Sequence, residues 1–158
     1  MTADLPIGIA ELAKGLAAGP DGFVRYRASE QNWLRLARGC AAGLSDLAGL
    51  WLADGAVTMA LVDAKRSVRV LVSLPLRKGA YPSVGQHHRP AIRLERTLRD
   101  LHAIAPTGLP DTRGWLDHGV WPQSAPGQDA GRRPQPGYEF LPVEGEGLHQ
   151  IPVGPVHA

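Results

Sequence analysis

An amphipathic helix bounded by two prolines places the strongest constraint on how this chain can fold. Leu94, Leu98 and Leu101 recur at spacings of four and three residues, which aligns them on one face of a helix. Pro90 precedes this segment and Pro106 follows it, so both ends of the helix are marked. Charged residues occupy its other faces. The pattern predicts a helix that packs its leucine face against a core.

A β-meander is predicted before this helix. Apolar runs at residues 47–53 and 57–62 flank Asp54 and Gly55, a dipeptide that supplies the positive φ of a tight hairpin turn. A third strand is predicted at residues 68–74, where apolar and polar residues alternate at the start. The three strands together predict a largely antiparallel sheet.

Two further helices and a strand are predicted nearer the N-terminus. Residues 5–18 favour a short helix, and the alternation over residues 23–27 favours a strand. Ser29 can cap a helix that runs to about Ala42 and buries Trp33. The order of elements predicts an α+β fold, a largely antiparallel sheet with helices packed on one face, followed by a Pro/Gly-rich C-terminal tail.

Composition changes abruptly after the first 121 residues. Residues 1–121 are long enough for one domain with a sizeable core. Residues 122–137 hold four prolines and three glycines without periodicity, which predicts a flexible linker. Residues 138–158 form a short final segment that carries no helix stop signal.

Charge and cysteine content exclude several classes of protein. The net charge is +2 and the arginines are dispersed, whereas nucleic-acid-binding proteins usually concentrate their basic residues, so we expect no nucleic-acid partner. Cys40 is the only cysteine, so the chain alone cannot build a disulfide framework or a thiolate-ligated cluster. The sequence shows neither a stretch of eighteen apolar residues nor a secretion signal, so any membrane association is expected through partners.

The histidines are the candidates for metal chemistry. His87 and His88 are adjacent in sequence, and a metal site would need further ligands such as His102 or His118. The alternative structural interpretation is that the pair contacts the start of the helix after Pro90. A small metal-dependent enzyme using His87, His88 and His118 therefore stays an alternative, as does a freestanding ligand-binding domain.

The residues of the predicted helix and the turn after it resemble a known family signature. The residues that carry the resemblance are Glu95, Arg96, Asp100, Leu101, Pro110, Asp111 and Arg113, with Tyr81–Val84 leading in. This pattern is similar to the thirty-kilodalton subunit in the peripheral arm of respiratory complex I. It is closer to the domain fused ahead of the large subunit in membrane-bound nickel–iron hydrogenases of the formate hydrogenlyase type. Thr97, His102 and Leu109 depart from the complex I pattern and favour the hydrogenase branch.

This resemblance implies a non-catalytic assembly domain of a membrane-associated oxidoreductase, either an NADH:quinone oxidoreductase or a formate hydrogenlyase-type hydrogenase. Such a domain would hold the large subunit and the small iron–sulfur subunits together without an active site or cofactor of its own. The parent complex would carry iron–sulfur clusters and a NiFe centre or quinone. Localisation would be cytoplasmic, peripheral to the inner membrane through the partner subunits.

The resemblance also implies where the partners would dock. The predicted docking surface is the signature helix and the turn at residues 110–121, where Trp115 and Trp121 add aromatic interface anchors. Residues 138–158 resemble the lead-in to a hydrogenase or complex I large-subunit domain, cut short. Within that segment Gly154, Pro155 and His157 match the start of a Gly-Pro-x-His strand on the approach to the quinone cavity.

Overall fold

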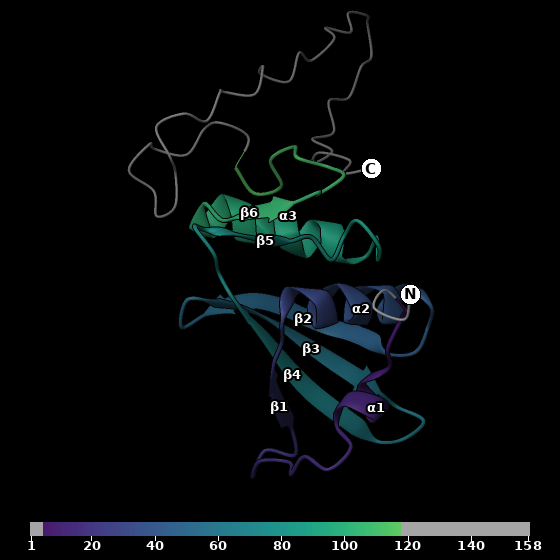
Figure 1. Ribbon diagram of the computed structural model, residues 1–158. Helices are drawn as coiled ribbons and strands as arrows, with labels where there is room; N and C mark the ends of the chain where they lie inside the picture. Colours follow the sequence, from purple (N-terminus) through teal and green to yellow (C-terminus); the bar gives the residue numbers. More distant parts are fainter. Residues whose placement is uncertain (1–4, 118–158) are drawn as a thin grey trace, which may run out of the picture.

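A four-stranded sheet underlies the fold in the computed structural model, which describes residues 5–117 (Figure 1). β2 (Asp46–Ala53) and β3 (Ala56–Asp63) form an antiparallel hairpin. β4 (Val68–Pro75) pairs antiparallel with β3, and β1 (Val24–Arg27) joins β4 in parallel, which gives the order β1-β4-β3-β2. The predicted α+β class with a largely antiparallel sheet is confirmed.

The hairpin turn has the geometry that its sequence predicts. Asp54 and Gly55 adopt positive φ values of 49° and 70°, the combination that matches the twist of the flanking strands. A register shift between Leu47 and Gly49 interrupts the pairing of β2 with β3. The parallel pairing of β1 was not predicted, because strand pairing depends on tertiary contacts that the local pattern does not contain.

Helices α1 (Ile9–Leu12) and α2 (Glu30–Ala41) contribute to the buried face of the sheet. Ser29 caps α2 as predicted, since its hydroxyl accepts from the backbone N–H of Asn32 at 3.3 Å. The predicted helix over residues 5–18 is wrong in extent, because only one turn forms there. The first residue of this turn is held by a residue far along the chain, since the Ile9 N–H donates to the Ser45 hydroxyl at 3.2 Å.

A second layer lies above α2 in Figure 1 and contains the signature helix. α3 (Ala91–His102) occupies the interval predicted between the two prolines, and Ala103 caps its C-terminal end in the left-handed conformation. β5 (Ala80–Pro82) and β6 (Ala105–Thr107) flank α3 in sequence and pair in parallel. This small sheet was not predicted.

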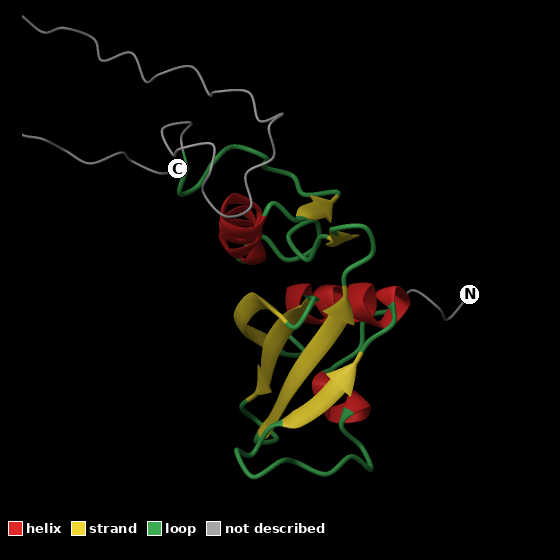
Figure 2. Cartoon of the chain, turned by 90° about the vertical axis from the view of Figure 1, so that its left-hand side faces the viewer, coloured by secondary structure: helices red, strands yellow, loops and turns green. Residues whose placement is uncertain are grey.

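One hydrophobic cluster connects the two layers. Trp33 of α2 meets Tyr81 of β5 edge to face, with ring centroids 6.0 Å apart, and its indole N–H donates to the Pro82 carbonyl. Ala91 and Leu98 of α3 are buried in the same cluster as the sheet. Figure 2 shows the sheet beneath the α3 layer. Among the described residues no helix is long and apolar enough to cross a membrane.

Candidate docking surface

Glu95 binds the loop before α3 from inside the protein. Its carboxylate accepts from the Ser83 hydroxyl at 2.7 Å and from the backbone N–H groups of Val84 and Gly85 at 2.7 and 3.0 Å. The side chain is fully buried. Three donors converge on one acidic group, so Glu95 fixes the loop's path against the helix.

Burial has consequences for ionisation around Glu95. It raises the pKa of the Glu95 carboxyl above its usual value, although the three hydrogen bonds act in the opposite direction. The hydroxyl of Tyr81 is buried beside this carboxyl without a hydrogen bond of good geometry. Burial and the nearby negative charge raise the pKa of Tyr81, so the phenol stays neutral.

Arg96 fixes the loop after α3. Its guanidinium donates to the carbonyls of Arg113 and Gly114 at 2.9 and 2.7 Å, and to the Asp111 carboxylate at 3.1 Å. The guanidinium also lies 5.2 Å from the ring centroid of Trp115. Arg96 is buried, and these contacts use donors on all three of its nitrogen atoms.

Asp100 binds the same loop one turn further along α3. Its Oδ2 accepts from the backbone N–H groups of Trp115, Leu116 and Asp117 at 2.7, 2.8 and 3.3 Å. Arg99 lies 3.7 Å from the other carboxylate oxygen. Together, Arg96 and Asp100 hold residues 111–117 in a defined conformation.

Asp111 is shared by two arginines. Arg113 donates to it at 2.8 Å and Arg96 at 3.1 Å. The hydrogen bond from Arg113 is the largest of several causes that lower the pKa of Asp111 to about 2. Asp111 is therefore ionised at neutral pH.

The outer surface of this region is cationic, although its sequence contains both signs of charge. Across residues 84–117, none of the acids is exposed, since Glu95, Asp100 and Asp117 are buried and Asp111 is half-buried. Three arginines are exposed on the same segment: Arg89, Arg93 and Arg113. Leu101 and Leu116 are 37% and 40% exposed. The backbone N–H of Leu116 donates to Asp100, the residue before Leu101.

The predicted signature residues divide into two groups. Arg96 and Asp100 are brought together with Asp111, Arg113 and Trp115 by hydrogen bonds and ring contacts. Glu95 binds the loop before α3 instead, and Pro110 is exposed at the start of the loop after it. Trp121, together with Gly154, Pro155 and His157, lies outside the described residues. Sequence reasoning missed Ser83 as the hydroxyl partner of Glu95; the Tyr-Pro-Ser-Val lead-in was the available signal.

The histidine alternative gains no support from the described part of the chain. His87 and His88 lie in the turn before α3, and the His88 carbonyl accepts from the Ala91 N–H at 3.0 Å. Burial is the main cause that lowers the pKa of both histidines. Between residues 5 and 117 no group of three or more His, Cys, Asp or Glu side chains could hold a metal ion. His118 lies outside this range.

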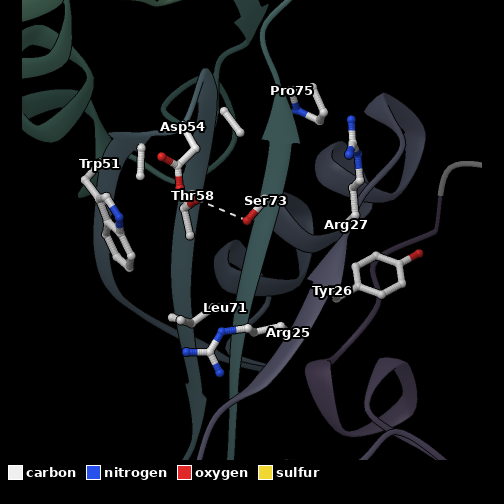
Figure 3. A pocket seen from close by; sticks show the side chains of 11 residues that line it. Arg25, Tyr26, Arg27, Trp51, Asp54, Thr58, Leu71, Ser73 and Pro75 are labelled. Atoms are coloured by element: carbon white, nitrogen blue, oxygen red, sulfur yellow. Dashed lines mark hydrogen bonds between the residues drawn. The ribbon is translucent and has the colours of Figure 1, made fainter. Parts of the chain in front are cut away.

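A second surface feature is a hollow of about 550 Å³ on the face of the sheet opposite the helices. In Figure 3, Trp51 stands on one side and Arg27 on the other, while the Arg25 guanidinium lies between them, below Leu71 in this view. A hydrogen bond of 3.1 Å between the Thr58 and Ser73 hydroxyls crosses the floor. Neither the signature residues nor the histidines line this hollow.

Comparison with known proteins supports the resemblance drawn from the signature. The chain is 32% identical over 102 residues, or 57% of its length, to formate hydrogenlyase subunit 5 of Escherichia coli (strain K12). It is also 32% identical over 100 residues to hydrogenase-4 component G of the same organism. The chain covers 18% of the length of each relative. No protein-family model matches. The predicted similarity to formate hydrogenlyase-type hydrogenase subunits is confirmed.

Proposed function

We propose that this chain is a docking domain of a membrane-associated hydrogenase complex of the formate hydrogenlyase type. It would hold the large subunit and the iron–sulfur subunits together and have no active site of its own. The observation that carries the proposal is the similarity to the two hydrogenase-complex subunits. Iron–sulfur clusters, a NiFe centre or quinone would then belong to the partners, and the domain would reach the cytoplasmic side of the membrane through them.

The surface formed by α3 and residues 109–117 supports this role physically. Arg96 and Asp100 bind backbone groups of the loop, so the loop backbone loses little conformational freedom when a partner binds. Leu101 and Leu116 supply apolar contact area. Arg93, whose guanidinium lies 5.2 Å from the centroid of the Trp115 ring, adds a cation at the edge. Apolar contact area with an arginine rim is typical of protein interfaces.

The final segment has a place in the same proposal. Residues 138–158, which include Gly154, Pro155 and His157, would lead into a large-subunit domain. The domain would then be tethered next to its principal partner, which raises the effective concentration of the docking surface.

A co-purification experiment tests the docking surface. The chain would be co-expressed with the large and iron–sulfur subunits of its complex, as wild type, as Leu116→Asp and as Leu44→Asp. Leu44 is a matched control, because it is 44% exposed and lies in the loop before β2. A desolvated charge in an interface should lower recovery of the partners at least about tenfold for Leu116→Asp. Unchanged recovery with Leu116→Asp, or equal loss with Leu44→Asp, would contradict the proposed surface.

A further inference from the structure

The face of the sheet opposite the helices combines small, apolar and hydroxyl side chains with arginines. We call it the open face; its residues on the two central strands are Ala56, Thr58, Ala60, Val62, Arg69, Leu71, Ser73 and Pro75. On β3 the alternate residues Val57, Met59 and Leu61 are buried against the helices. β3 therefore carries apolar or small residues on both of its faces. That pattern is typical of a strand in a sheet covered on both sides.

The hollow on the open face lies over neighbouring strands of the sheet. Its floor is built from β3 and β4, where small side chains such as Ala56 allow another backbone to approach closely. Trp51, 37% exposed, forms one wall, and Arg27 of β1 stands on the other side in Figure 3. Among residues 5–117, the helices contribute their buried side chains to the other face.

The charges of the open face select an acidic occupant. Arg27 and Arg69 are exposed, and within residues 5–117 neither has an acidic partner. Arg25 is already bonded to Asp21 at 2.6 Å. Asp54, the acid that lines the hollow, lies at the hairpin turn beyond Trp51. An occupant with carboxylates near β1 and β4 and apolar side chains over the floor would complement this arrangement.

We propose that residues 138–146 of this same chain bind in the hollow on the open face. The segment reads Tyr-Glu-Phe-Leu-Pro-Val-Glu-Gly-Glu, so it combines two aromatic and two aliphatic side chains with three carboxylates and no cation. Residues 118–137 separate it from the described fold and can span at most about 70 Å when extended. A domain of this size is roughly 35 Å across, so the open face is within reach.

A tethered segment also has an advantage over other occupants. A linker of this length gives an effective concentration approaching the millimolar range, so weak contacts suffice. A second copy of the chain is disfavoured, because a two-fold interface would bring the arginines of two open faces toward one another. This inference does not depend on the proposed hydrogenase role.

Nuclear magnetic resonance on the full isotope-labelled chain tests the proposal. The probes are the indole N–H of Trp51 and the backbone amides of Arg27 and Ser73. Phe140→Ser with Leu141→Ser should shift all three signals, since the apolar contacts are lost. Leu148→Ser with Ile151→Ser is the matched control, because it removes two apolar side chains just beyond the segment, and it should leave the signals in place. The amide of Met59 reports whether the core stays intact.

The acidic contribution has its own test. Replacing Glu139, Glu144 and Glu146 by glutamine should move the same signals in the same direction as the Phe140 and Leu141 substitutions, but less far. Each lost ion pair with an arginine of the open face should weaken docking roughly two- to fivefold at low salt. Asp129→Asn should have no effect. Signals unchanged by the Phe140 and Leu141 substitutions would overturn the proposal. Signals that depend on protein concentration would assign the face to a second copy, and signals that move only on addition of the large subunit would assign it to a partner.

Discussion

The sheet and the signature region, residues 81–117, are stabilised in different ways. The sheet relies on apolar side chains, with Val57, Met59 and Leu61 fully buried against the helices. The signature region relies on Glu95 and other charged groups that are buried and fully engaged with loop backbone. Hydrophobic burial is non-directional and tolerates adjustment, whereas a buried charge that loses its partners costs several kcal/mol. The signature residues are therefore required for the shape of the surface, even where they do not contact a partner.

The largest effect is expected from Glu95→Ala. The substitution leaves the Ser83 hydroxyl and the N–H groups of Val84 and Gly85 buried without their acceptor. The free energy of unfolding should fall by about 3–5 kcal/mol in urea denaturation. Glu11→Ala, on an exposed residue of α1, should change it by less than about 0.5 kcal/mol. Equal effects of the two would remove the contrast between buried and surface acids.

A pH titration sharpens the same point. The pKa of Glu95 is raised in the folded state, so the folded protein holds the carboxyl proton more tightly than the unfolded chain does. The protonated carboxyl therefore stabilises the fold below pH 4.5, and this contribution is lost as the pH rises through the pKa of the folded state. Glu95→Gln should abolish that slope. A stability profile of the same shape in the glutamine variant would show that Glu95 is not its source.

Arg96→Ala should have the next largest effect. It leaves the Arg113 and Gly114 carbonyls without their donor and removes one partner of Asp111. We expect a loss of about 2–3 kcal/mol, with faster amide exchange at Trp115.

Arg93→Ala is the control for Arg96, because it removes only an exposed cation over the same Trp115 ring, worth about 1 kcal/mol or less. If the Arg93 substitution loosened the loop as much as the Arg96 substitution, the ring contact rather than the carbonyl bonds would be holding it.

A smaller effect is expected where a polar contact serves the sheet half of the molecule. Ser29→Ala removes the side-chain cap of α2. Because this hydroxyl is exposed, water can take its place as the acceptor, so the free energy of unfolding should fall by only about 1 kcal/mol in thermal or urea unfolding. Ser29→Asp, which keeps an acceptor at the cap, should restore the stability. A loss as large as that of Glu95→Ala would contradict the account of the sheet half.

The smallest expected effect is that of Asp111→Asn. The pKa of Asp111 is lowered to about 2, so its stabilising contribution is present above pH 3.8 and is lost as the pH falls through about 2. Arg113 is largely exposed, and asparagine keeps one oxygen acceptor for the buried Arg96, so the substitution should cost about 1 kcal/mol or less at neutral pH. Acid unfolding curves of the two proteins should converge near pH 2. Curves that remain parallel would exclude the ion pair as the cause.

The sheet half was largely predictable because its signals are local. Asp54 and Gly55 specify the hairpin turn, Ser29 specifies the start of α2, and period-two alternation marks strands. The ends of all four strands fall within one residue of prediction. Local patterns do not show which strands pair in the tertiary structure, so the parallel position of β1 and the pairing of β5 with β6 were missed.

The signature region was harder to predict in physical detail. The spacing of Glu95 and Arg99, and of Arg96 and Asp100, suggests surface ion pairs along a helix. In the structure Glu95 binds the preceding loop and Arg96 pairs with Asp111, which lies fifteen residues away. The family resemblance identified these residues without their mechanism, because sequence spacing does not show which side of a helix the chain later covers.

Amide hydrogen exchange on the chain, alone and mixed with the large and iron–sulfur subunits of its complex, tests the docking proposal most directly. The account predicts that exchange across residues 91–117 slows on mixing, most at the exposed end of α3 and at Leu116, while residues 56–63 are unchanged. Exchange that is identical with and without the subunits would contradict a docking role for this surface.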